Sequence, residues 1–113
     1  MLRIFLLIIL SVSIAKVPNA QIRHVEPLNW WVGMKDPAVQ VMVHGVDIAE
    51  TMPVIKYPGV KLVKVHKADS KNYLFLDLII STATKPGEVQ IKFLKNGKTV
   101  YTHQYPLKQR VTG

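Results

Sequence analysis

Hydrophobic and polar residues alternate along most of the chain after residue 20, and a period of two residues predicts β-strands. In residues 88–94, Val89, Ile91 and Phe93 alternate with polar side chains, so one face of this segment would point into a core. The segment 73–80 is the most apolar, and we predict a central strand there. The other predicted strands are residues 22–26, 39–44, 54–57, 60–66 and 99–107.

Turn signals separate these segments. Pro58-Gly59 closes the strand 54–57, and Pro86-Gly87 turns the chain into the strand 88–94. Asn96-Gly97 predicts a two-residue hairpin because both of its turn positions need a positive φ. Only residues 46–51 could hold a short helical turn. About seven short strands in one domain predict an all-β fold, an immunoglobulin-like β-sandwich.

The N-terminus has the order of a secretory signal peptide. Arg3 precedes an apolar run from residue 4 to residue 15, and Ala20 is a small residue suited to cleavage, with Ala15 as the alternative. The run is shorter than the roughly 20 apolar residues that span a bilayer, although an uncleaved anchor is the competing interpretation. The predicted organisation is a signal peptide (1–20), one domain (21–110) and the start of a linker (111–113), in a periplasmic or secreted protein.

The amino-acid composition limits the kinds of site and partner that the chain can have. The 113 residues carry a formal net charge of +8 and no cysteine, which excludes disulfides and thiolate metal sites. The lysines fall mainly on outward strand positions and in turns, where they oppose edge-to-edge aggregation. Aromatic residues do not interleave with them, so we expect no nucleic acid partner. A basic protein of the cell envelope is a weaker alternative.

No catalytic constellation is evident. The seven acidic residues form no marked pair, the four histidines have no ligand spacing, and no serine lies in a G-x-S-x-G motif. Asp77, inside the central strand, is expected to be a hydrogen-bonded polar group on the solvent face. We therefore predict no catalytic residues, no metal site and no cofactor.

Five segments carry a resemblance to a known family. They are Val25 to Pro37, with its core Trp30-Trp31-Val32-Gly33-Met34, then Val39 to Gly45, Tyr57 to Val60, Asn72 to Asp77, and Lys85-Pro86-Gly87 followed by Ile91 and Phe93. In these segments the chain resembles the N-terminal domain of bacterial cyclomaltodextrinases and neopullulanases. Leu28 stands where that family has a second proline, and Asp36 where it has asparagine. The resemblance covers essentially residues 22–110.

The resemblance implies a glycan-degrading context without making this chain a hydrolase. In the full enzymes, an α-amylase-type barrel follows this domain and its carboxylates cleave α-1,4 linkages. The chain is thus expected to be a non-catalytic module that positions the barrel and contributes to a subunit interface. Its expected partners are that barrel, a second subunit and, in one interpretation, an α-glucan.

Trp30 and Trp31 are the candidate site residues. Adjacent residues on a strand point to opposite sides, so one indole would lie inside and the other at the surface. Both could simply be buried against the sandwich or the barrel, which we favour, because an indole is a large apolar group. Alternatively, an exposed indole could stack on sugar rings, which would make the chain an independent starch- or maltodextrin-binding module.

Overall fold

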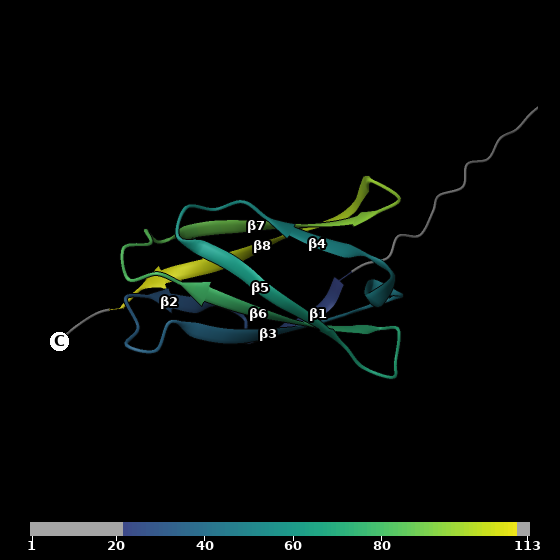
Figure 1. Cartoon of the computed structure of the whole chain (residues 1–113), viewed down its shortest axis with the longest axis horizontal. Coiled ribbons are helices and arrows are strands. Elements are labelled where there is room, and N and C mark those ends of the chain that lie inside the picture. Colours follow the sequence, from purple (N-terminus) through teal and green to yellow (C-terminus); the bar gives the residue numbers. More distant parts are fainter. Residues whose placement is uncertain (1–21, 111–113) are drawn as a thin grey trace, which may run out of the picture.

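The computed structural model describes residues 22–110, which form two four-stranded sheets packed face to face (Figure 1). The strand orders are β1-β3-β6-β5 and β2-β8-β7-β4. The elements are β1 (Ile22–Glu26), β2 (Trp30–Val32), β3 (Ala38–Gly45), the 3-10 turn η1 (Ile48–Glu50), β4 (Met52–Ile55), β5 (Val60–Lys67), β6 (Tyr73–Ile80), β7 (Gly87–Lys95) and β8 (Lys98–Gln109). The all-β prediction is confirmed. The signal peptide predicted for residues 1–20 and the linker residues 111–113 lie outside the described residues.

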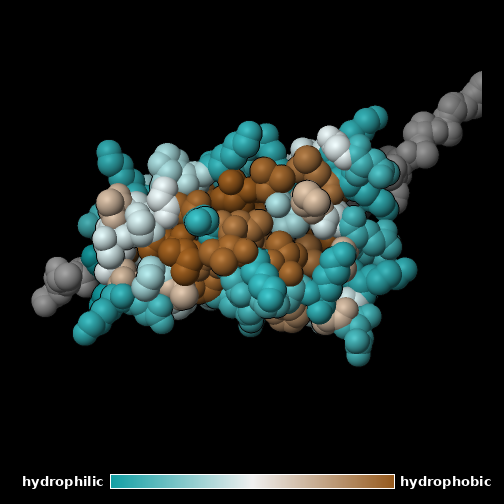
Figure 2. All heavy atoms as spheres, in the orientation of Figure 1, coloured by the Kyte–Doolittle hydropathy of each residue, from teal (hydrophilic) through white to brown (hydrophobic). Residues whose placement is uncertain are grey.

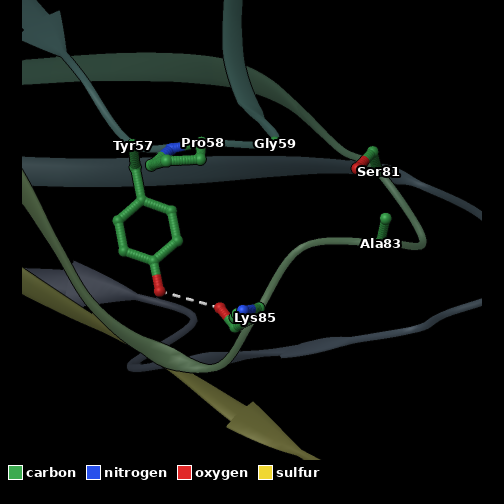
Figure 3. Close-up of a pocket in the computed structure, with 6 residues that line it drawn as sticks. All are labelled: Tyr57, Pro58, Gly59, Ser81, Ala83 and Lys85. Carbon is green, nitrogen blue, oxygen red and sulfur yellow. Dashed lines mark hydrogen bonds between the residues drawn. The ribbon is translucent and has the colours of Figure 1, made fainter.

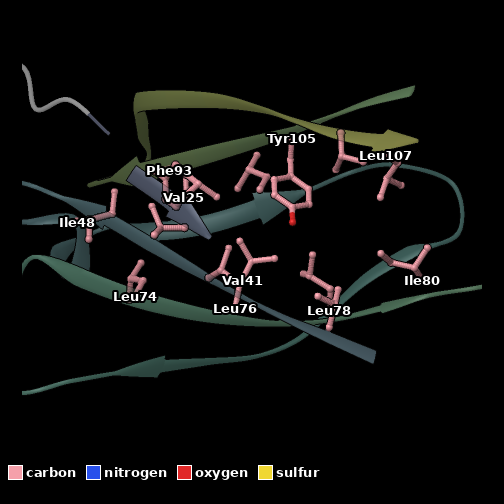
Figure 4. Packing of buried hydrophobic residues seen from close by; sticks show 14 of the residues in the cluster. Val25, Val41, Ile48, Leu74, Leu76, Leu78, Ile80, Phe93, Tyr105 and Leu107 are labelled. Atoms are coloured by element: carbon pink, nitrogen blue, oxygen red, sulfur yellow. The ribbon is translucent and has the colours of Figure 1, made fainter. Parts of the chain in front are cut away.

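Strand β6 lies in the interior of its sheet, between β3 and β5, as its apolar sequence predicts. Its inward side chains Leu74, Leu76 and Leu78 are at most 2% exposed. Figure 4 shows them facing Phe93, Tyr105 and Leu107 across the space between the sheets. Burying each such side chain contributes roughly 1.5 to 3 kcal/mol, so this core is the main source of stability in a chain without disulfides.

Two details of the strand pattern differ from the sequence prediction. Residues 30–32 form a strand that was not predicted, because β2 has three residues and its partner β8 lies far along the chain. The fourth strand spans Met52–Ile55 rather than residues 54–57. Tyr57 belongs to the following turn instead, where its carbonyl accepts a hydrogen bond from the Val60 N–H at 3.0 Å.

The hairpin between β7 and β8 turns at Asn96-Gly97, with φ values of 53° and 79°, as predicted. The helical turn predicted within residues 46–51 is η1, whose Ile48 and Ala49 are buried. No helix in residues 22–110 has the length and apolar character needed to cross a membrane.

Strand β5 contains an irregularity that a strict alternation does not predict. Its register against β6 shifts between Leu62 and Lys64, which leaves Val63 56% exposed. The extra residue restores the inward direction for Val65, which packs against the core. On the face seen in Figure 2, hydrophobic residues form a connected band along the middle, bordered by hydrophilic residues.

Candidate functional site

The two tryptophans lie at the end of the sandwich where β8 ends. Strand β2 pairs in parallel with β8, which places Trp30 beside Leu107 and Trp31 beside Lys108. Because β7 begins at Gly87, opposite Leu107, the loop between β6 and β7 lies at the same end. This end, shown at the left of Figure 1, thus gathers β2, the close of β8 and the β6–β7 loop.

The indoles of Trp30 and Trp31 have different surroundings. Trp30 packs against the core cluster and is partly buried. Trp31 lies on the opposite face of the strand and is 37% exposed. The ring centroids are 5.4 Å apart and the planes are tilted by 56°. The exposed indole of Trp31 therefore lies beside the partly buried indole of Trp30. Within the described part of the chain, the outer surface of the Trp31 indole is free for contact.

Buried polar groups accompany the pair. The Nε1 of Trp30 and the Nδ2 of Asn29 are buried and have no hydrogen-bond acceptor within residues 22–110. The hydroxyl of Tyr105 is also without a partner there, and Figure 4 shows it directed from β8 toward the opposite sheet. Burial raises the pKa of Tyr105, so the phenol stays protonated. Most buried donors in folded proteins are hydrogen-bonded, and each unpaired one costs about 1 to 3 kcal/mol.

A cavity of about 540 Å³ lies between the β4–β5 turn and the β6–β7 loop (Figure 3). Its lining includes Tyr57, Ser81 and Lys85. The Tyr57 hydroxyl donates to the Lys85 carbonyl at 2.7 Å, and the Ser81 N–H donates to the Gly59 carbonyl at 2.9 Å. These bonds link the two loops that connect the sheets at this end.

The cavity walls require two glycines. A Cβ on Gly59 would lie 2.1 Å from the Thr84 Oγ1, and a Cβ on Gly87 would lie 2.6 Å from the Tyr57 hydroxyl. Gly59 also has a φ of +91°, which favours glycine. The Pro-Gly pairs of the sequence thus serve close packing of the two loops. This explains them without a catalytic role.

A second polar cluster lies on the outer face of the β1-β3-β6-β5 sheet. Asp77 accepts a hydrogen bond from the Gln40 Nε2 at 2.8 Å, and its other oxygen is 2.6 Å from the His66 Nε2. The bonds from His66 and then Gln40 hold the pKa of Asp77 below its usual value. Asp77 is thus a hydrogen-bonded group on the solvent face, as expected. Sequence reasoning missed its partners, because they depend on strand register.

The other titratable groups do not assemble a catalytic or metal site in the described residues. Glu50 is 2.9 Å from the Lys95 Nζ, and this hydrogen bond is the main cause of its lowered pKa. No three histidine or acidic side chains within residues 22–110 lie close enough together to hold a metal ion. His103 on β8 lines the same groove as His24 on β1, and burial lowers the pKa of His103.

A protein-family model described as Cyclomaltodextrinase, N-terminal matches residues 24–111. The matched range runs from β1 through the end of β8 and includes the tryptophan pair and both Pro-Gly turns.

Proposed function

This chain belongs to the cyclomaltodextrinase N-terminal domain family, and on that basis we propose that it is the non-catalytic N-terminal module of a secreted or periplasmic α-glucan-degrading enzyme. The module would position an α-amylase-type barrel and contribute to a subunit interface. The family match over residues 24–111 is the observation that carries this proposal.

We also propose an immunoglobulin-like assignment for the fold. In that fold, the first, second, fifth and fourth strands form one sheet, and the remaining strands form the other. The order β1-β3-β6-β5 fits this scheme if β2 is the part of the first strand that switches to the second sheet. The proposed export rests on the order of basic, apolar and small residues in positions 1–20.

Trp31 and its surroundings are the proposed contact with the barrel. A polypeptide continuing from β8 would emerge beside β2, because the two strands run in parallel. A domain docked there would cover the exposed Trp31. Exposed aromatic groups of this kind often mark protein contacts.

The test uses the purified chain and a separately produced amylase-type barrel from the same genome. We expect no release of reducing sugar from cyclodextrin or starch by the chain alone, and measurable binding to the barrel. Trp31→Ala should weaken that binding at least about tenfold. The matched control is Met52→Ala, since Met52 is 68% exposed on β4, opposite Leu94 and remote from β2. Hydrolysis by the clean chain, or equal effects of both substitutions, would contradict the proposal.

A second candidate function rests on the exposure of the Trp31 indole, which is 37%. A free aromatic face can stack on a sugar ring, so the chain could bind α-glucan by itself. Calorimetric titration with maltoheptaose separates the two functions. We expect no saturable heat. Saturable binding that Trp31→Ala abolishes, without loss of folding, would favour the glucan-binding module.

A further inference from the structure

A groove of about 320 Å³ lies on the outer face of the β2-β8-β7-β4 sheet, where β4, β7 and the start of β8 run side by side. Ile91 and Phe93 of β7 are buried in the core, so the residues that alternate with them point outward, away from the other sheet. The groove is lined by Val54, Lys56, Gln90, Lys92, Leu94 and Thr99. Its volume is near the lower end of the range for ligand sites, which suits a small ligand.

Two lysine side chains of this groove can reach the same point. Ile55 pairs with Ile91 in antiparallel register, so the next residue, Lys56, comes beside Gln90 and lies diagonally from Lys92. Diagonal neighbours on one face of a sheet are about 7 to 8 Å apart, which is within reach of long side chains. Both lysines are exposed, and their ammonium groups are therefore free to converge on one ligand.

No carboxylate lines the groove to neutralise the two lysines. The lysines that form ion pairs within residues 22–110 are Lys71 and Lys95, both with Glu50. Among the described strands of this sheet, only Glu88 is acidic, and it lies four positions from Lys92, roughly 13 Å along β7. Two neighbouring positive charges repel each other, and a bound anion would remove that repulsion.

We propose that this groove binds a phosphate group between Lys56 and Lys92, either as the free anion or as a small phosphate ester. A phosphate group carries a charge of about −1.5 to −2 near pH 7, which matches two ammonium groups, and lysine is a common phosphate ligand. Gln90 and Thr99 line the same groove and carry neutral donors for the remaining oxygens. The carbon atoms of an ester would lie against the apolar lining residues.

The phosphate site is independent of the proposed contact with a barrel. Strand β2 pairs with the last residues of β8, from Leu107 to Gln109, whereas Thr99 in the groove is near the first residue of that strand. The exposed Trp31 is therefore far from the groove along β8. Phosphate binding needs neither barrel nor α-glucan, so either proposal can fail without the other.

Titration of the purified, ¹⁵N-labelled chain with sodium phosphate tests the site through amide chemical shifts. We expect saturable shifts in residues 54–56 and 90–94, with a dissociation constant of about 1 mM or below at low ionic strength. Added sodium chloride should weaken the binding, because salt screens exposed charges. Lys92→Gln should raise the dissociation constant at least about fivefold, and the double variant Lys56→Gln/Lys92→Gln should show no saturation.

The matched control is Lys61→Gln, which removes the same charge from an exposed position on β5, in the other sheet. It should leave phosphate binding unchanged, and urea midpoints should show that all three variants keep the wild-type fold. Equal weakening by Lys61→Gln and Lys92→Gln would overturn the inference, since the effect would then come from net charge alone. The absence of saturable shifts with any phosphate compound would also overturn it.

Glucose 6-phosphate and glucose distinguish the two sources of the phosphate group. Tighter binding of glucose 6-phosphate than of inorganic phosphate would identify the ligand as a small ester that also contacts Val54 and Leu94. Equal affinity would identify the free anion. Glucose alone should cause no shift in the groove, and saturable shifts there with glucose as large as those with its phosphate would contradict a phosphate site.

Discussion

At the scale of single residues, Trp30 and Trp31 are adjacent in sequence and opposite in role. Trp30 fills space against the core, while Trp31 is exposed on the outer face. Truncating a large buried side chain costs both transfer free energy and a cavity. We expect Trp30→Ala to lower the free energy of unfolding by about 3 kcal/mol, and Trp31→Ala by less than about 1 kcal/mol. Urea denaturation of both variants measures this. Equal losses would mean that both indoles belong to the core.

The Asp77 cluster predicts a pH dependence. The hydrogen bonds from His66 and Gln40 lower the pKa of Asp77 in the folded protein, whereas the unfolded chain has the ordinary value of 3.8. The stabilisation is therefore complete above about pH 5 and is lost as the pH falls through the folded-state pKa. Asp77→Asn should be less stable than wild type near neutral pH, and should lose less stability on acidification.

Urea midpoints measured between about pH 6 and about pH 2 test this. The control is Asp69→Asn, because the exposed Asp69 makes no side-chain hydrogen bond or ion pair within residues 22–110. If Asp77→Asn and the wild-type chain lost stability equally on acidification, the cluster would have no role in it.

At the scale of elements, the β4–β5 turn and the β6–β7 loop support each other. Gly59 has a φ of +91° and contacts Thr84, while Gly33 has a φ of +73° and nothing within 4 Å of an added Cβ. Gly33→Ala should thus cost only the backbone strain, about 1 kcal/mol. Gly59→Ala should cost about 2 to 3 kcal/mol, since Thr84 must also move and disturb its hydrogen bond with Ser81. Thermal denaturation compares the two. A larger loss in Gly33→Ala would contradict the close packing seen here.

Prediction of strands from the sequence succeeded where hydrophobic and polar residues alternate over a long segment. It failed where contacts between distant parts of the chain determine the strand. The strands β6 and β7 follow directly from their apolar periodicity. Strand β2 did not, because a three-residue pairing with Leu107–Gln109 leaves no periodic signal. The bulge in β5 likewise depends on the register with β6, which the sequence of β5 alone does not contain.

The candidate site was predictable only in part, for the same reason. The motif around Trp30 and Trp31 identified the residues, and strand geometry gave them opposite directions. The neighbours of the pair were not predictable, because Lys108 follows them by more than seventy positions. The partners of Asp77 also come from other strands, since Gln40 is 37 positions away.

At the scale of the whole molecule, the short pairings of β1 with β3 and of β2 with β8 attach the start of the described chain to both sheets. The first strand segment, β1, belongs to one sheet, and β2 crosses to the other, where it lies against the last strand. The chain therefore spans both layers within its first described residues, and a single core is enclosed from both sides (Figure 4). No cysteine is present to reinforce this closure, so packing and strand pairing provide it alone.

The parallel pairing of β2 with β8 also has a mechanical consequence. The start of β1 and the end of β8 lie at opposite ends of the sandwich, since Ile22 is opposite Gly45 and Leu107 is opposite Gly87. Tension between these ends pulls β2 backward and β8 forward, along the direction of both strands. The evenly spaced hydrogen bonds between them are then loaded in shear, all at once, instead of being opened one after another. The three-residue strand β2 therefore resists force that is applied between whatever is joined to the two ends of the domain.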